Sequence, residues 1–196
     1  MNVLVACEES QTVCKAFRAR GHAAFSCDLY ECSGGHPEWH IQSDVITILG
    51  DGWDLVIAHP PCTYLTVAGN RWLKENPGRA ALRELGYEFA LKFVKAHENG
   101  AFPRLCIENP VGYLNTHYRK PDQIIQPYYF GDAYSKRTCL WLFNLPKLSA
   151  DNVVECKSLC QGGWFEHPPK GVPRSVWRSK TAPGIARAMA EQWGCC

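Results

Sequence analysis

The sequence of 196 residues predicts a single α/β domain built on an open, mostly parallel β-sheet with helices on both faces. Three observations support this fold class. Short apolar runs alternate with longer stretches of helical periodicity. Several runs are apolar throughout, as in strands that are buried on both faces. Polar residues follow these runs, at the edge where such sheets carry their chemistry.

The individual elements follow from these patterns. The predicted strands cover residues 3–7, 23–27, 54–58, 104–107 and 138–143. The predicted helices cover about 10–20, 78–98 and 183–193, and Gly21 is placed to end the first of them. Within 78–98, helical spacing predicts a buried face that carries Leu82, Leu85, Phe89 and Phe93. Residues 44–49 form a short element, and 30–40 is a loop.

The same patterns divide the chain into three parts. Residues 1–144 form the α/β core, and 145–180, rich in Pro, Gly and Trp, form a small irregular C-terminal lobe. Residues 181–196 contain a closing helix that returns to the core.

Composition limits the partners and the compartment. The net charge of +2 is nearly neutral, so a nucleic acid would have to bind a local basic patch. No apolar run reaches the roughly 18–20 residues that span a bilayer, and the N-terminus lacks a basic leader region. Several of the eleven cysteines lie in apolar runs, which is typical of buried free thiols. We therefore expect a reduced, cytoplasmic protein without a membrane partner.

Three of the predicted strands are followed by residues whose side chains can take part in catalysis or ligand binding. Asp28 follows the second strand, His59-Pro60-Pro61-Cys62 the strand at 54–58, and Glu108-Asn109-Pro110 the next. Because parallel strands end at one edge, an acid, a thiol and a second acid are expected to meet there. The alternative, that each residue only forms a turn, is as plausible for Asp28 alone and less so for the set.

Cys62 is the candidate nucleophile. Two prolines fix the backbone before it, so its thiol is held in a stiff loop. A cysteine nucleophile needs thiolate character, which a nearby base or a helix N-terminus can supply. Glu108 is a candidate acid that could protonate a ring nitrogen of a bound base, or form a hydrogen bond with it.

The order of these segments resembles the cytosine-5 DNA methyltransferases, and also a set of short phage-type proteins similar to them. His59-Pro60-Pro61-Cys62 resembles the Gly-Pro-Pro-Cys motif, and Glu108-Asn109-Pro110 the Glu-Asn-Val motif. The segment 134–142 resembles the Gln-x-Arg-x-Arg strand, with Arg137 at an arginine position. Asp28 and Asp44 match two cofactor-binding acids, and Thr181-Ala182-Pro183-Gly184-Ile185-Ala186 loosely resembles the last motif.

The resemblance implies a Rossmann-like class I methyltransferase fold and a DNA (cytosine-5) methyltransferase activity. S-adenosylmethionine would be the methyl donor, and DNA or a cytosine nucleotide the substrate. Cys62 would attack C6 of cytosine, Glu108 would bind and protonate N3, and Arg137 would hold O2. The implied cofactor contacts are Glu8, Ser10, Asp28, Leu29, Asp44 and Pro60. The implied substrate contacts are Pro61, Asn109, Arg71, Arg174 and Arg178.

Two departures from the family leave the donor and the substrate open. The glycine-rich first turn is replaced by Ala6-Cys7-Glu8-Glu9-Ser10-Gln11. Either Glu8 or Glu9 could bind the amino group of the methionine moiety, or both could simply complement the helix dipole. The large target-recognition domain is also absent, since only about 40 residues separate Arg137 from Thr181.

Two basic stretches could contact a nucleic acid. The lobe combines Lys170, Arg174, Arg178 and Lys180 with Trp164 and Trp177, which suits phosphate contact and base stacking. A second run after Cys62 contains Arg71, Lys74, Arg79 and Arg83, and in the family this loop closes over a flipped-out base. The alternative for each is a solvated surface.

Metal ligation is the weaker interpretation of the Cys and His residues, and no metal is expected. Cys27, Cys32, His36 and His40 form one set, and Cys156, Cys160, His167 and Cys195-Cys196 a looser one, but neither shows the tight Cys-x2-Cys pair typical of zinc sites.

Three functions remain open at this stage. The first is methylation of cytosine C5 in DNA. The second is the same chemistry on a free cytosine nucleotide or on single-stranded DNA, or with a different transferred group. The third is an inactive nucleic-acid-binding module of methyltransferase-like fold. The sequence does not determine the target site or the oligomeric state.

Overall fold

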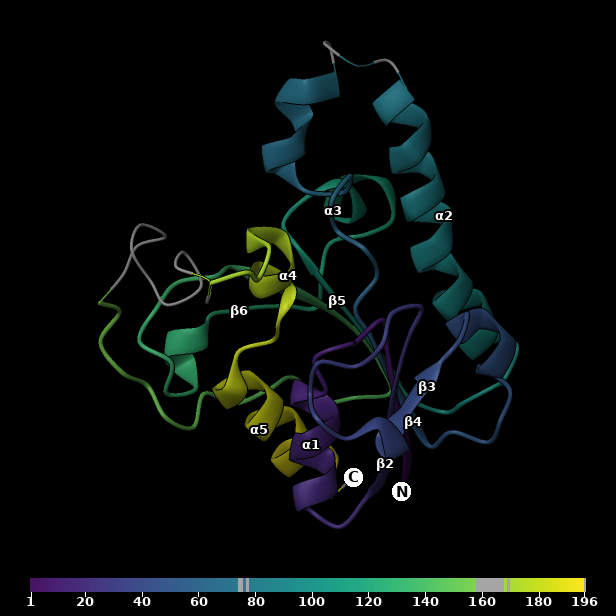
Figure 1. Cartoon of the computed structure of the whole chain (residues 1–196), viewed down its shortest axis with the longest axis vertical. Helices are drawn as coiled ribbons and strands as arrows, with labels where there is room; N and C mark the ends of the chain where they lie inside the picture. The colour runs from purple at the N-terminus through teal and green to yellow at the C-terminus, as the bar shows by residue number, and fades with distance from the viewer. Residues whose placement is uncertain (74–75, 77, 158–167, 169, 196) are drawn as a thin grey trace.

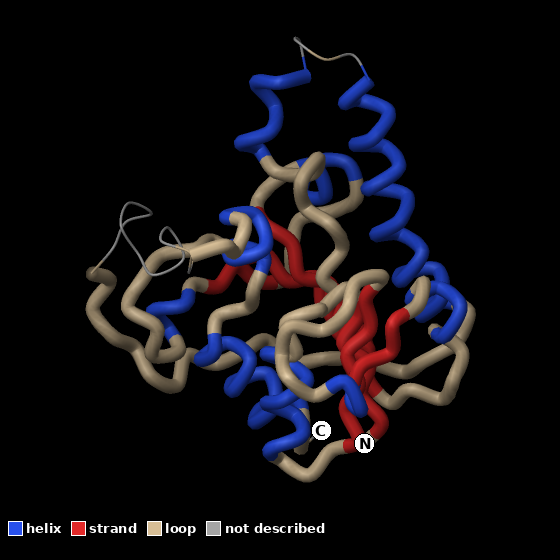
Figure 2. Tube along the Cα trace, viewed as in Figure 1, coloured by secondary structure: helices blue, strands red, loops and turns tan. Residues whose placement is uncertain are grey.

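A computed structural model describes residues 1–73, 76, 78–157, 168 and 170–195 of the chain. It contains a seven-stranded sheet in the order β3-β2-β1-β4-β5-β7-β6, which Figures 1 and 2 show with helices on both sides. The predicted α/β, Rossmann-like fold class is confirmed.

Five strands are parallel and form most of the sheet. They are β1 (Asn2–Ala6), β2 (Ala23–Asp28), β3 (His40–Gln42), β4 (Leu55–Ala58) and β5 (Leu105–Pro110). β1 pairs with β2 on one side and with β4 on the other. The strand order therefore reverses between β1 and β4, and in open α/β sheets ligands bind at the carboxyl ends of the strands beside such a switch point.

The last two strands run differently. β7 (Thr138–Phe143) is antiparallel to both β5 and β6 (Gln123–Ile125). Because β7 enters the sheet from the edge where β5 ends, the residues just before β7 lie at the same edge as the carboxyl ends of β4 and β5. In register, Thr138 is opposite Pro110.

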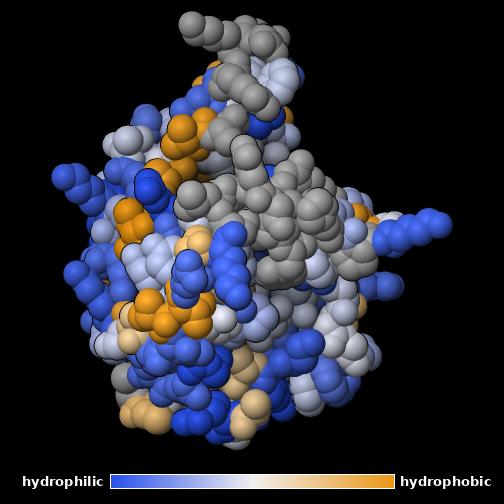
Figure 3. All heavy atoms as spheres, turned by 90° about the vertical axis from the view of Figure 1, so that its left-hand side faces the viewer, coloured by the Kyte–Doolittle hydropathy of each residue, from blue (hydrophilic) through white to orange (hydrophobic). Residues whose placement is uncertain are grey.

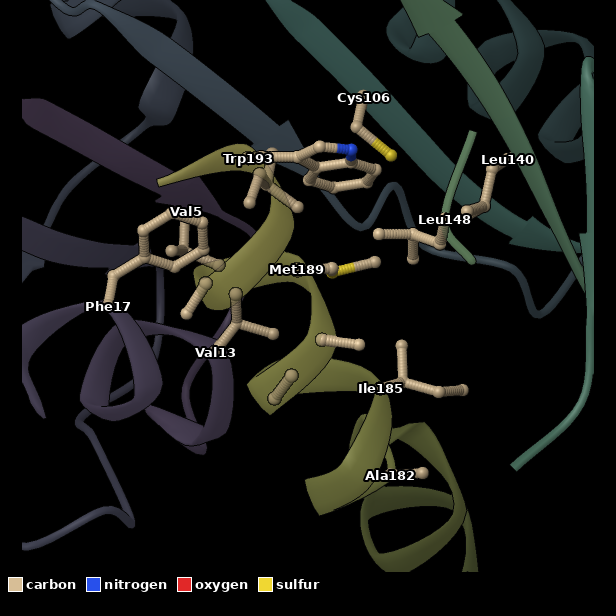
Figure 4. Close-up of a cluster of buried hydrophobic side chains, with 14 of the residues drawn as sticks. Val5, Val13, Phe17, Cys106, Leu140, Leu148, Ala182, Ile185, Met189 and Trp193 are labelled. Carbon is tan, nitrogen blue, oxygen red and sulfur yellow. The ribbon is translucent and has the colours of Figure 1, made fainter. Parts of the chain in front are cut away.

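One face of the sheet is covered by α1 (Thr12–Ala19) and α5 (Pro183–Trp193), which pack against each other. Figure 4 shows their apolar side chains meeting those of the sheet. Phe17 and Trp193 are fully buried there. The predicted closing helix is found over the predicted residues because Ile185, Ala186, Met189 and Trp193 form one apolar stripe.

The opposite face is covered by α2 (Gly78–Glu98), the longest helix, as predicted. Its predicted buried face is partly wrong. Phe93 is buried, but the Leu82 and Leu85 side chains are 43% and 61% exposed. The N-terminal half of α2 extends beyond the strands (Figure 1), so its leucines have no sheet beneath them.

One short element was predicted, several others were not, and one boundary was wrong. The 3-10 helix η2 (Val45–Ile48) occupies the short element predicted at 44–49. The elements that were not predicted are the helices α3 (Tyr113–His117) and α4 (Arg174–Ser179) and the 3-10 helices η1 (Pro37–Trp39), η3 (Val67–Leu73) and η4 (Pro127–Tyr129). β3 and β6, of three residues each, are too short to show a period. β5 continues through Glu108 to Pro110 because these residues pair with β7.

The described helices include none that is both long and apolar enough to cross a bilayer. On the face drawn in Figure 3, hydrophobic side chains lie in small groups among polar ones.

Candidate active site

The turn between β1 and α1 keeps an unusual backbone without glycine. Cys7 has φ 59° and Gln11 has φ 58°, both in the left-handed region that glycine usually occupies. The Gln11 side chain stabilises the turn, since its amide bonds both the N–H and the carbonyl of His36. The left-handed conformation is therefore achieved with non-glycine residues, at the conformational cost that is typical of functional turns.

Glu8 caps α1 from inside the protein. Its side chain is buried and accepts hydrogen bonds from the N–H groups of Val13, at 2.6 Å, and Cys14, at 3.1 Å. Burial raises the pKa of Glu8, while the charge of His59 and the two backbone hydrogen bonds oppose that rise. Ser10 contributes to the same cap through Glu8 and Thr12. Glu8 therefore caps α1, and its predicted cofactor contact stays a prediction.

The neighbouring Glu9 is the better candidate for a cofactor contact. Its Oε1 is buried and has no hydrogen-bond partner among the described residues. Its main-chain carbonyl accepts from the N–H of Ser33, so the loop after β2 folds back over this turn. The sequence named Glu8 and Glu9 together, and packing assigns them different environments.

Asp28 and Asp44 lie together beside the first turn. Burial raises the pKa of the Cys7 thiol, and the charges of Asp28 and Asp44 raise it further. Each aspartate also stabilises a local turn, Asp28 by accepting from the N–H of Tyr30 and Asp44 from that of Ile46. Next to them, Leu29 and Tyr30 are 68% and 75% exposed, so an apolar surface borders the two carboxylates.

Cys62 lies in a loop that is tied to its neighbours. Arg79 and Arg83 of α2 donate to the carbonyls of Thr63, at 3.0 Å, and Tyr64, at 3.0 Å. Gly112 lies so close that a Cβ there would be 1.8 Å from the Leu65 carbonyl oxygen. Arg79 and Arg83, predicted to contact a nucleic acid or solvent, therefore hold the Cys62 loop.

Glu108 forms a pair with His59 across the ends of β5 and β4. His59 Nδ1 lies 3.2 Å from Glu108 Oε2, and both side chains are mostly buried. Burial favours the neutral form of Glu108. Hydrogen bonds from His59 and Thr138, together with the charges of His59 and Lys136, outweigh burial and lower the pKa of Glu108.

Cys62 and Glu108 share one electrostatic environment. Burial raises the pKa of Cys62, and the negative charge of Glu108 raises it further. Lys136 and Arg178 act in the opposite direction. The thiol, the carboxylate and the two cations are thus brought together from the ends of β4 and β5, the start of β7 and α4.

The predicted contact of Arg137 with the base stays a prediction. Arg137 is exposed, and its charge acts on Cys139 and Tyr128. The charge of the neighbouring Lys136 acts on Glu108 and on Cys62. Lys136 Nζ also donates to the Lys180 carbonyl, which links this site to the end of α4.

A buried hydrogen bond between Asn109 and Pro60 joins the ends of β5 and β4. Asn109 is 1% exposed, and its Nδ2 donates to the Pro60 carbonyl at 2.9 Å. Asn109 therefore positions the Pro-Pro-Cys turn, and its predicted substrate contact stays a prediction. Its Oδ1 is buried without a partner among the described residues, and Pro61 is exposed.

Some predicted residues cannot be placed. The side chains of Arg71 and Arg174 lie outside the described part of the structure, as do Lys74, Cys160, Trp164, His167 and Cys196. Within the described part, no three Cys, His, Asp or Glu residues are grouped to hold a metal ion. Of the first candidate metal set, Cys27 donates to the Ser43 carbonyl, and His40 bonds Ser26 and the Tyr30 carbonyl.

Sequence reasoning missed His59 and Lys136 as individual site residues, and it named Glu9 only as an alternative to Glu8. The signal for His59 was its position in the motif, where the resembled family has glycine. The signal for Lys136 was its place next to Arg137, in the segment that resembles the Gln-x-Arg-x-Arg strand.

No protein-family model matches this chain, and no curated protein matches it. Among solved structures, the chain is similar to a candidate DNA modification methyltransferase encoded within an E. coli prophage. The TM-score is 0.47 and the identity 14%, over 72% of this chain and 46% of that one. The chain thus spans about half the length of that protein, and its function is argued below from its own residues.

Proposed function

We propose that this protein is an S-adenosylmethionine-dependent methyltransferase that modifies C5 of cytosine in DNA through a covalent bond to Cys62. One observation carries the proposal: Cys62 and Glu108 lie within electrostatic reach of each other at the carboxyl ends of β4 and β5, with Lys136 acting on both. A thiol and an acid so arranged can add to C6 and protonate N3 of one pyrimidine ring.

In the proposed reaction, every electron pair and proton is accounted for. The Cys62 thiolate forms a bond to C6, and the displaced electron pair ends on N3, which takes a proton from Glu108. This makes C5 nucleophilic. After C5 is substituted, its original proton leaves to solvent, the S–C6 bond breaks and N3 returns its proton to Glu108. Lys136 supports thiolate formation by its charge.

The residues that follow β1, β2 and β3 suit the proposed cofactor. S-adenosylmethionine supplies an electrophilic methyl group. The N-terminus of α1, where dinucleotides place their phosphates, already holds the Glu8 carboxylate, so a cofactor without phosphates fits better than a dinucleotide. Glu9 Oε1, buried and unpartnered among the described residues, suits the methionine ammonium group. Asp28, Asp44 and the exposed Leu29 suit the ribose and adenine.

The substrate would approach from the side of α4. Arg178 lies within electrostatic reach of Cys62, and the Lys180 ammonium lies 5.4 Å from the centre of the Trp177 ring. Cations and a partly buried aromatic beside a nucleophile suit a nucleotide phosphate and a stacked base.

The proposal is tested by mass spectrometry of nucleosides from the DNA of cells that express the protein. We expect a C5-modified cytosine with the wild type and none with Cys62→Ala. Cys195→Ala is the matched control, because Cys195 is an exposed thiol in the C-terminal segment. Modification that persists in Cys62→Ala would contradict the mechanism.

A second candidate is the same chemistry on single-stranded DNA or a free cytosine nucleotide. It is favoured by the short connection between β7 and α5, in which α4, of six residues, is the one regular helix or strand among the described residues. Turnover on deoxycytidine monophosphate, single strands and duplex separates the candidates. A preference for duplex with fixed flanking sequence would exclude the second.

The third function, an inactive binding module, makes a different prediction. It requires that the protein bind nucleic acid but form no adduct with 5-fluorocytosine DNA in the presence of S-adenosylmethionine. A Cys62-dependent adduct, together with calorimetric binding of the cofactor, would exclude it.

A further inference from the structure

His59 stands where the resembled motif has glycine, and the structure gives it contacts that a glycine cannot make. Its Nδ1 lies 3.2 Å from Glu108 Oε2. The exposed fractions of the two side chains are 11% and 15%. The imidazole is therefore inserted at the end of β4, beside the acid that the proposed mechanism uses as its proton donor.

Two carboxyl groups lie near His59. Glu108 of β5 lies on one side, and the buried Glu8 at the end of β1 lies close enough for His59 to oppose the rise of its pKa. Lys136, which acts on Glu108, is the opposing cation, and Cys62 is the nearby thiol. His59 Nε2 is buried without a hydrogen-bond partner among the described residues.

These contacts address a difficulty in the proposed mechanism. Because the pKa of Glu108 is lowered, this carboxyl is ionised more readily than usual and does not hold a proton for N3 by itself. An imidazolium at 3.2 Å can supply that proton, since histidine changes charge near neutral pH.

We propose that His59 is a positioning residue for Glu108 and stores the proton that Glu108 delivers to N3 of the target cytosine. This inference rests on the proposed function. The proton passes from His59 Nδ1 to Glu108 and from Glu108 to N3 as the S–C6 bond forms, leaving a neutral imidazole. When the adduct breaks down, N3 returns the proton along the same route, so the net transfer is zero.

The test measures tritium release to water from cytosine labelled at C5, without a methyl donor. Addition of Cys62 to C6 makes C5 nucleophilic, so C5 can take a solvent proton and lose its tritium. Duplex, single-stranded and mononucleotide substrates are assayed from about pH 6 to about pH 9, a range that brackets histidine titration. The variants are His59→Asn, which keeps a donor near the Nδ1 position but holds no exchangeable charge, and His59→Ala, which loses both.

We expect both variants to lose about 10²–10⁴-fold in exchange rate at the acidic end, where the imidazolium that stores the proton is present in the wild type. The loss should shrink toward the alkaline end, where the wild-type imidazole is neutral and holds no proton to deliver. Free imidazole should restore part of the rate to His59→Ala and none to His59→Asn. The matched control is His97→Asn, because Nδ1 of His97 bonds the Phe102 carbonyl beyond the end of α2, outside the site.

Other outcomes would contradict the inference on His59 or the proposed function. A wild-type rate and pH profile in His59→Asn would reduce His59 to a hydrogen-bond donor and overturn proton storage. Equal losses at every pH without rescue by imidazole would do the same. If the wild type itself releases no tritium from any substrate, the proposed function fails. Nitrogen NMR that finds His59 Nδ1 without a proton overturns the inference on His59 alone.

Discussion

The candidate active site has two halves, the first formed by the segments after β1, β2 and β3 and the second by the segments after β4 and β5. The two halves differ in the hydrogen bonds that their polar side chains form. At the ends of β1 and β2, Glu8, Asp28 and Asp44 each accept hydrogen bonds from nearby backbone N–H groups. At the ends of β4 and β5, Glu108 pairs with a side chain, and buried atoms of His59 and Asn109 have no partner among the described residues. Apart from Glu9 Oε1, which has no partner among the described residues, the carboxylates of the first half are satisfied by the backbone, while the second half has spare hydrogen-bonding capacity.

This difference distinguishes side chains that stabilise the fold from side chains that remain available to a ligand. A carboxylate that caps a helix contributes to folding whether or not a ligand is bound. A buried polar atom without a partner lowers stability unless a ligand supplies one. Substitution of Glu8 is therefore expected to change mainly the free energy of unfolding, and substitution of Glu108 mainly the activity.

The largest expected effect is on the chemistry of the second half. Glu108→Gln removes the proton donor to N3 but keeps the shape of the side chain, and we expect activity to fall by about 10²–10⁴-fold. The free energy of unfolding should change little, because the amide can still bond His59 or Thr138. Tritium release and urea unfolding measure the two quantities. A comparable loss of stability would remove the contrast between the halves.

The next effect is on the stability of the first half. Glu8→Ala leaves the N–H groups of Val13 and Cys14 buried without an acceptor, which costs about 2–4 kcal/mol of unfolding free energy. Glu8→Gln keeps one acceptor and should lose less. Urea unfolding measures both variants. An unchanged free energy of unfolding in Glu8→Ala would mean that α1 does not need this cap.

A smaller effect is expected where the loops after β4 and β5 touch. In Gly112→Ala the new methyl group would overlap the Leu65 carbonyl, so the Cys62 loop must shift, at a cost of about 1–3 kcal/mol. Thermal unfolding and tritium release should both decline. The control is Gly50→Ala, where an added Cβ meets no atom within 4 Å. Equal behaviour of the two variants would contradict the close approach.

The smallest effect concerns the pH dependence of Cys62. Because burial and Glu108 raise the pKa of Cys62, its thiolate fraction at neutral pH is low and alkylation by iodoacetamide should accelerate only toward alkaline pH. Glu108→Gln removes a negative charge, so the alkylation profile should move to lower pH. Lys136→Gln removes a positive charge, so the profile should move to higher pH. Peptide mass spectrometry follows the rates, and shifts in the same direction would refute the arrangement.

The fold class was predictable because the spacing of apolar residues within each element is a local property of the sequence. The strands at β1 and β4 are apolar runs, and α5 carries a regular apolar stripe, so their residue ranges were predicted to within about two residues. Leu82 and Leu85 were predicted wrongly because helical spacing identifies an apolar stripe but not whether anything packs on it. In α2 that stripe extends past the sheet into solvent.

The sequence by itself determined the fold class and the candidate nucleophile and acid, Cys62 and Glu108, since both follow from residues that end apolar runs. Only the tertiary structure decided which neighbours act on them. His59 pairs with Glu108, the charge of Lys136 acts on both Glu108 and Cys62, and Glu8 caps a helix. The physical reason is that burial, charge and hydrogen bonding depend on side chains that lie far apart along the chain and meet only when the sheet is assembled.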